Sequence, residues 1–246
     1  MQRRNFLKTA AAGAALAATG PYFLGAADKA GSKGPVLGSG EHRYECVHNW
    51  GELPADFPWQ TTHGVCVDAA GLVSITHMGH DGKAPLDVVL VFDPKGKFVR
   101  SFGKDFFLGG HGIDVRNEGG EVFLYLCNMM PVRSVVKTTL KGEVVWNKSF
   151  PQEAKVYKDV NGFAPTNVAL GADGGFYVGD GYGSNYIHDL AWRKKVLAGF
   201  KVRADEKQWE AGKFIHPHDA CFDKDGNIFV VEWVQSGRVT LLKKIG

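Results

Sequence analysis

Thr62-His63-Gly64-Val65-Cys66-Val67-Asp68 is the first of four similar stretches that decide the fold. The others are Gly110-His111-Gly112-Ile113-Asp114-Val115-Arg116, Pro165-Thr166-Asn167-Val168-Ala169-Leu170-Gly171 and Pro217-His218-Asp219-Ala220-Cys221-Phe222-Asp223. Each stretch runs into a glycine-containing turn and then an apolar strand, and the copies begin about fifty residues apart. Third and fourth strands follow, most clearly at residues 88–92 and 97–103. Four antiparallel strands recurring at this interval are typical of β-propeller blades.

The composition agrees with an all-β repeat. Glycine makes up 32 of the 246 residues, and the Asp-Gly and Gly-Gly turns supply the positive φ that tight hairpins require. We therefore predict an all-β propeller domain over residues 44–246, with four recognisable blades. A β-sandwich would explain the strands, but it would leave the aligned His-Gly starts unexplained.

A strand near the N-terminus is expected to complete the last blade. Residues 44–51 resemble an outer fourth strand that lacks a blade of its own, and the last copy ends after its third strand, at residues 238–242. Pairing these two strands would close the ring and cover both exposed sheet edges.

The first 27 residues have the parts of an export signal. Arg3 and Arg4 precede an uncharged stretch, residues 9–24, which is too short to span a hydrocarbon core of about 30 Å as a helix. The Arg-Arg-x-Phe-Leu-Lys pattern and the small residues up to Ala27 indicate a cleavable twin-arginine signal. We expect a periplasmic or secreted monomer with no membrane attachment after cleavage, and a flexible linker at residues 28–43.

Charge and cysteine usage exclude two classes of function. The net charge is +3, and residues 1–27 contain three basic and no acidic residues, so the remaining chain is neutral. A neutral chain lacks the basic face that nucleic-acid binding requires. None of the four cysteines forms a Cys-x-x-Cys pair, so a zinc knuckle is unsupported, and buried free thiols are expected.

The repeats resemble NHL-type propeller blades and, more narrowly, the peptidyl-α-hydroxyglycine α-amidating lyases. The resemblance covers most of residues 62–246. It is carried by Gly110-His111-Gly112-Ile113, Ala164-Pro165-Thr166-Asn167-Val168, Pro217-His218-Asp219, and the stretch from Phe176 to Asn185 with its Asp180-Gly181-Tyr182 motif.

The resemblance implies a metal-dependent lyase with its site in the central channel. It implies that His111 and His218 bind zinc and that Tyr182 is catalytic. It also implies a structural calcium held by Asp219 and the carbonyls of Val65 and Ile113. Such a lyase splits a carbinolamide into an amide and glyoxylate, so a small-molecule or peptide substrate is expected in the channel.

The sequence departs from that family in three respects. The family has six blades, whereas four copies and the closing strand are recognisable here, with the shortening between His188 and Phe200. The family's third zinc-binding histidine belongs to a missing blade, and His63 is the candidate replacement. Met78 stands where the family has an arginine that would steady a substrate carboxylate.

Other functions remain open from the residues alone. Histidines at one repeat position converge on the propeller axis, where they bind a metal or polar ligand or simply hydrogen-bond to one another. The chain is accordingly also compatible with a non-catalytic propeller that binds a peptide or protein, and with a metal-dependent lactonase-like hydrolase.

Overall fold

The computed structural model describes residues 34–245, apart from residues 56, 81, 83, 153–154, 171–174, 181, 183–186, 189–210, 212–216 and 235. Within strands, the side chains of residues 177, 187–188, 217–218, 220 and 222 are also outside the description. Among these residues the regular elements are sixteen β-strands and two short 3-10 helices, η2 (Lys104–Phe106) and η4 (Val160–Gly162). None of the described helices could cross a membrane.

The strands form four antiparallel sheets, each built from a segment that the repeat predicts. The first contains β3 (Thr62–Val67), β4 (Val73–His77), β5 (Val89–Phe92) and β6 (Phe98–Phe102) in chain order. The second contains β7 (Gly110–Glu118), β8 (Glu121–Asn128), β9 (Ser134–Thr139) and β10 (Val144–Lys148). The third contains β11 (Asn167–Leu170), β12 (Phe176–Gly179) and β13 (Ile187–His188). The fourth has the order β1 (Val36–Ser39), β2 (His42–His48), β16 (Arg238–Lys244), β15 (Ile228–Glu232) and β14 (Pro217–Phe222).

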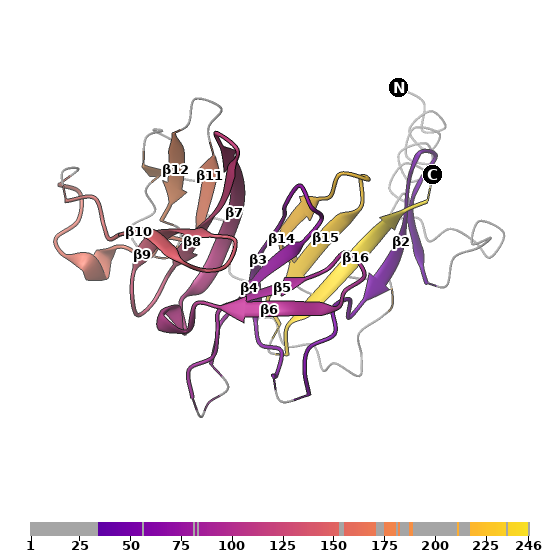
Figure 1. The fold of residues 1–246 in the computed structure, drawn as a ribbon, viewed down its shortest axis with the longest axis horizontal. Helices are drawn as coiled ribbons and strands as arrows, with labels where there is room; N and C mark the ends of the chain where they lie inside the picture. The colour runs from indigo at the N-terminus through magenta and orange to yellow at the C-terminus, as the bar shows by residue number, and fades with distance from the viewer. Residues whose placement is uncertain are drawn as a thin grey trace, which may run out of the picture.

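The sheets are arranged side by side as in a propeller, which confirms the all-β repeat (Figure 1). Their first strands are neighbours in the order β14, β3, β7 and β11, so the four repeated stretches of sequence come together in space. The described residues show four sheets, not the six blades of the NHL family. Residues 189–210, where the sequence departs from the six-bladed pattern, lie outside the described part of the chain.

Glycines allow these first strands to approach one another. A Cβ on Gly64 would lie 2.8 Å from the carbonyl oxygen of His111, and one on Gly112 would lie 2.5 Å from that of Thr166. The Thr76 hydroxyl fixes the first approach, because it accepts a hydrogen bond from the Gly64 N–H and donates one to the His111 carbonyl. The His-Gly pairs of the sequence therefore set the spacing between neighbouring sheets.

Apolar side chains fill the spaces between the sheets. One cluster joins the first and second sheets through residues such as Val89 and Leu126. A second joins the first sheet to the fourth around Trp50, whose ring centroid lies 4.7 Å from that of Phe229. A third joins the second and third sheets around Phe163. Burial on both faces explains why β5 is a continuous apolar run rather than an alternating one.

The predicted pairing of the chain ends is confirmed. β2 pairs antiparallel with β16, with Val47 opposite Leu241 and His48 opposite Thr240. The His48 Nδ1 lies 2.7 Å from the Thr240 hydroxyl oxygen, so a side-chain hydrogen bond joins the two strands in addition to the backbone pairing. The N-terminal strand is thus the fourth strand of the last sheet.

Residues 36–43, which belong to the expected linker, form a β-hairpin. Val36–Ser39 forms β1, which pairs with β2 in a hairpin that brings Ser39 opposite His42. Gly38 and Gly40 adopt φ values of 85° and 56°, so they shape this hairpin instead of loosening the chain. Residues 28–33 lie outside the described part of the chain.

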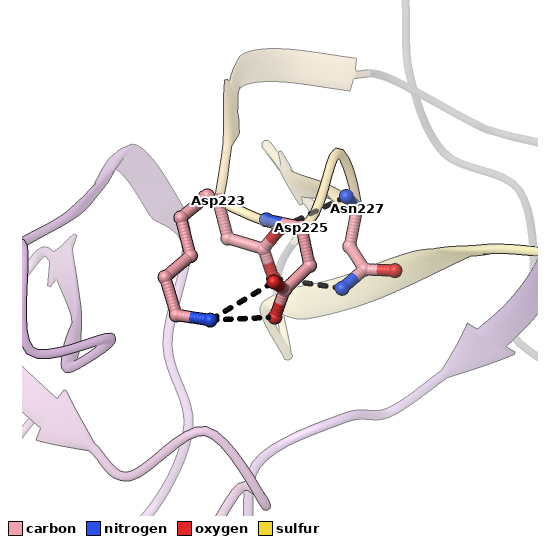
Figure 2. Close-up of polar contacts among 4 residues, drawn as sticks. Asp223, Asp225 and Asn227 are labelled. Atoms are coloured by element: carbon pink, nitrogen blue, oxygen red, sulfur yellow. Dashed lines mark hydrogen bonds and ion pairs between the residues drawn. The ribbon is translucent and has the colours of Figure 1, made fainter.

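The Asp225-Gly226 turn between β14 and β15 forms as expected (Figure 2). The Asp223 carboxylate accepts hydrogen bonds from the backbone N–H groups of Asp225 and Asn227, both at 2.9 Å. Gly226 takes the positive φ of 79° that the turn needs. The Asp225 carboxylate points the other way and pairs with the Lys224 ammonium at 2.9 Å.

Candidate functional site

A cavity of about 290 Å³ lies where the first strands of the sheets meet. It is lined by His63, His111, Gly112, Thr166, Asn167, Tyr182 and Asp219. Every residue in this set except Tyr182 stands at or next to the start of a repeat, on β3, β7, β11 or β14 or, for Thr166, directly before β11, and Tyr182 follows β12. The repeated stretches thus combine to build one pocket.

Two imidazoles form one wall of the pocket. The rings of His63 and His111 stack with centroids 4.6 Å apart and planes 19° apart. Both residues are buried, with 4% of their surface exposed. The stack exists because the two residues hold the same repeat position on adjacent strands, β3 and β7.

The third sheet fixes the orientation of His111. Its Nδ1 lies 2.6 Å from the carbonyl oxygen of Thr166, which also accepts the Gly112 N–H at 2.9 Å. Thr166 is held in turn, since its N–H and its hydroxyl both donate to the Gly179 carbonyl. A carbonyl can only accept, so Nδ1 carries the proton and Nε2 is the basic nitrogen of the neutral ring.

Tyr182 stands at the mouth of the pocket. Its ring meets that of His111 edge to face, with centroids 5.5 Å apart and planes 74° apart. The side chain is 59% exposed, so a ligand entering the cavity from solvent would pass the phenol on its way to His111.

Asp219 faces the histidines from the fourth sheet. Its Oδ2 accepts a hydrogen bond from the backbone N–H of Val65 at 3.1 Å, which joins β14 to β3. In the repeat, Asp219 and Asn167 occupy the position that Gly64 and Gly112 occupy on the other two strands. Two sheets therefore contribute a polar side chain where the other two contribute only backbone.

The cysteines on β3 and β14 have raised pKa values. Burial is the main reason that the pKa of the Cys221 thiol rises to about 12, and three carboxylates, Asp219, Asp223 and Asp114, add to the rise. Burial also raises the pKa of Cys66, with contributions in the same direction from Cys221, Asp114, Asp219 and Asp68. Burial raises the pKa of Asp114 itself. All four cysteines are free thiols.

Most of the residues predicted for the site lie together. His63, His111, Tyr182 and Asp219 line one cavity, and the backbone N–H of Val65 donates a hydrogen bond to Asp219. Ile113 is 3% exposed and packs in the core between the first two sheets. His218 lies on β14 beside Asp219, and its side chain is outside the described residues.

Sequence reasoning did not assign Thr166, Asn167 and Gly112 to the site. The signal was present, because all three stand at aligned repeat positions. The role of Thr166 nevertheless depends on its backbone carbonyl, which any residue type would supply.

A metal centre is not evident in the part of the chain that the structure describes. Among those residues, no group of three or more His, Cys, Asp or Glu side chains is arranged to hold a metal ion. The expected zinc set includes His218, whose side chain is outside that part.

Comparison with known proteins identifies the export signal. Residues 1–20 match the twin-arginine translocation pathway signal sequence, so the chain is exported by the twin-arginine route. No curated protein sequence gives a significant match.

Solved structures give loose similarities. A catalytically inactive H270A virginiamycin B lyase from Staphylococcus aureus, with quinupristin, aligns with a TM-score of 0.41 and 14% identity over 81% of this chain. A selenomethionine-substituted structure of the same lyase gives a TM-score of 0.40 at 14% identity. A protein of unknown function from Bacteroides caccae gives 0.35 at 14% identity, over 82% of this chain and 65% of its own. The chain spans 60% of the length of the virginiamycin B lyase structures.

Proposed function

We propose that this exported protein is a lyase that acts by proton transfer in the pocket at the first strands of the sheets. The observation that carries the proposal is the arrangement of His111. Its Nδ1–H is held by the Thr166 carbonyl, its ring is stacked on His63, and Tyr182 lies 5.5 Å away at the entrance. A base fixed in one tautomer next to a phenolic acid suits elimination reactions.

The reaction that fits these groups best is the cleavage of a carbinolamide. His111 Nε2 takes the proton of the substrate hydroxyl, and the oxygen electrons form a carbonyl group as the carbon–nitrogen bond breaks. The amide nitrogen leaves with the bonding electrons and takes a proton from the Tyr182 hydroxyl. The products are an amide and, for a peptidyl-α-hydroxyglycine, glyoxylate. Tyr182 then regains the proton that His111 accepted.

The proposal includes zinc, held by His111 and His218 with His63 as a third ligand. Histidines that bind a metal through Nε2 usually donate Nδ1–H to a carbonyl or carboxylate, and His111 does so to Thr166. The bound ion would supply a Lewis acid that lowers the pKa of the substrate hydroxyl. In the zinc-bound form His111 Nε2 would be a ligand in place of its role as the base, the hydroxyl proton would pass to solvent water, and Tyr182 would remain the proton donor to the leaving nitrogen.

Calcium at Asp219 fits the described residues poorly. Asp219 is the sole carboxylate among the described residues of the lining, and its Oδ2 already accepts the Val65 N–H. Calcium takes about six to eight oxygen ligands. We therefore derive no step of the reaction from calcium.

The test is glyoxylate release from a peptidyl-α-hydroxyglycine by the purified mature protein, with zinc measured by elemental analysis. We expect Tyr182→Phe and His111→Gln to lower turnover by about a hundredfold or more, the range typical of a lost general acid or base. His218→Ala should lose zinc together with activity. His42→Gln is the matched control, because His42 is exposed on β2.

Two other functions predict different results in the same experiment. Hydrolysis of a lactone without glyoxylate release would favour a lactonase-like hydrolase. Ligand binding in the pocket, with no turnover of either substrate, would overturn the lyase and indicate a binding propeller.

A further inference from the structure

We propose that Asn167 sets the substrate class of the pocket by binding a carboxylate through its side-chain Nδ2. This proposal rests on the proposed function, whose substrate has one group that the reaction does not engage. The reacting carbon of a peptidyl-α-hydroxyglycine carries a hydroxyl, an amide nitrogen and a carboxylate. The proposed reaction places the hydroxyl at His111 and the nitrogen at Tyr182. The carboxylate therefore needs a hydrogen-bond donor close to both residues, because an unsatisfied carboxylate in the pocket would weaken binding.

The amide group of Asn167 is held in one orientation. The backbone N–H of Val168 donates a hydrogen bond of 2.9 Å to the Asn167 Oδ1. This oxygen also lies against Gly112 on the neighbouring strand, since a Cβ there would be 2.4 Å from it. An N–H can only donate, so the atom that faces it is the oxygen and the other end of the amide is the NH₂ group.

The NH₂ group is the part of Asn167 that a ligand can use. The side chain lines the cavity and is exposed. Among the residues that the structure describes, none accepts a hydrogen bond from its Nδ2. Two N–H donors are thus available to an acceptor in the cavity, and a carboxylate is an acceptor with two oxygens.

Asn167 stands beside the two residues assigned to the chemistry. It directly follows Thr166, whose carbonyl oxygen lies 2.6 Å from the His111 Nδ1. It also pairs across β11 and β12 with Gly179, which precedes Tyr182 by three residues. Substituents of one carbon are close together, so the side chains that bind them must be neighbours. Asn167 meets this requirement from the same sheet that carries Tyr182.

The position of Asp219 is compatible with a carboxylate at Asn167. Asp219 stands on β14 and Asn167 on β11, and the first strands β3 and β7 lie between them. The Asp219 Oδ2 accepts a hydrogen bond from the Val65 N–H on β3. A ligand carboxylate at the β11 side of the pocket would therefore meet a neutral donor before it meets a like charge.

The first test compares two unreactive ligands, N-acetylglycine and N-acetylglycinamide, which differ only in a carboxylate and a carboxamide. Both are titrated calorimetrically into the mature protein at neutral pH. We expect N-acetylglycine to bind about five- to tenfold more tightly, because a hydrogen bond to a charged acceptor is roughly twice as strong as one to a neutral acceptor. Equal affinities, or tighter binding of the amide, would overturn the proposal without any variant of the protein.

The second test is Asn167→Asp, which keeps an oxygen to accept the Val168 N–H and replaces the NH₂ group by an anionic oxygen. We expect N-acetylglycine to bind at least about tenfold more weakly, because the donors are lost and a like charge is added. N-acetylglycinamide should bind no more weakly than before, which also shows that the pocket is intact. Asn147→Asp is the matched control, since it makes the same change at an exposed residue of β10, at the other edge of the second sheet from β7.

Turnover separates this proposal from the lyase. In an active enzyme, Asn167→Asp should raise the KM for a peptidyl-α-hydroxyglycine about tenfold and change kcat much less, because binding of the carboxylate is shared by the bound substrate and the transition state. Glyoxylate release with an unchanged KM in Asn167→Asp would overturn the role of Asn167 and leave the lyase. Preference for N-acetylglycine that is lost in Asn167→Asp, in a protein that releases no glyoxylate, would contradict the lyase alone.

Discussion

Single residues at the repeat starts determine both the packing of the sheets and the geometry of the pocket. His63 and His111 could be predicted to converge, because residues at one repeat position on first strands face one axis. Asp219 stands one position further along its repeat, and only the family resemblance implied a role for it. The tautomer of His111 could not be predicted, since the group that fixes it is the backbone carbonyl of Thr166. The hydrogen bond from the Val65 N–H to Asp219 could not be predicted for the same reason, because every residue type except proline supplies a backbone N–H.

Gly112 gives a prediction at this scale. A Cβ at this position would lie 2.4 Å from the Asn167 Oδ1 and 2.5 Å from the Thr166 carbonyl oxygen, so β11 would have to move away from β7. We expect Gly112→Ala to destabilise the protein by about 1–3 kcal/mol and to loosen the hydrogen bond that orients His111. Activity or ligand affinity in the pocket should fall with it.

The measurements are the urea concentration at the midpoint of unfolding and the rate of glyoxylate release. Gly179→Ala is the matched control, because a Cβ there would meet its nearest neighbour, Thr166 Oγ1, at an ordinary 3.7 Å. If Gly112→Ala unfolds at the same urea concentration as Gly179→Ala, β7 and β11 do not depend on this close contact.

Among the elements, the pairing of β2 with β16 could be predicted from the sequence, whereas the pairing of β1 with β2 could not. The strand period and the incomplete last repeat predicted that β2 would pair with β16, and it does. The glycines ahead of β2 indicate a linker by composition, although a glycine with positive φ serves a hairpin turn equally well. Composition cannot distinguish these two uses. The pairing of β1 with β2 depends on the register of both strands.

The paired N-terminal strands give a prediction at the scale of elements. Deleting residues 34–49 should expose the edge of β16 and cause self-association, because an uncovered strand edge offers unpaired N–H and carbonyl groups. The deletion must stop before Trp50, which packs against Phe92 and Phe229 in the core. Light scattering and thermal unfolding would measure the effect, with a chain that begins at residue 34 as control. A deletion variant that remains monomeric and melts like the control would contradict a stabilising role for β2.

On the scale of the whole molecule, the pairing of the two ends connects the fold to its route of export. β2 follows the signal closely in the sequence, but its partner β16 is synthesised much later, because His48 and Thr240 are 192 residues apart. The fourth sheet can therefore form only after β16 has been synthesised. A route that carries folded proteins permits this, whereas threading an unfolded chain would separate β2 from β16 during transport.

The export signal gives the last prediction. Replacing both arginines, Arg3→Lys and Arg4→Lys, should keep the protein in the cytoplasm, because the twin-arginine pair is the feature that the route reads in residues 1–20. The retained protein should be folded and uncleaved, whereas the exported wild type should begin near Asp28, after cleavage at Ala27. Cell fractionation with N-terminal sequencing measures both properties, and protease resistance of the cytoplasmic fraction reports whether β2 and β16 have paired before transport. Lys8→Arg is the control, since it conserves the charge of the signal and leaves the arginine pair intact. Export of the double-lysine variant at the level of this control would mean that the chain leaves the cytoplasm by another route, and the need for a fold completed before transport would no longer follow.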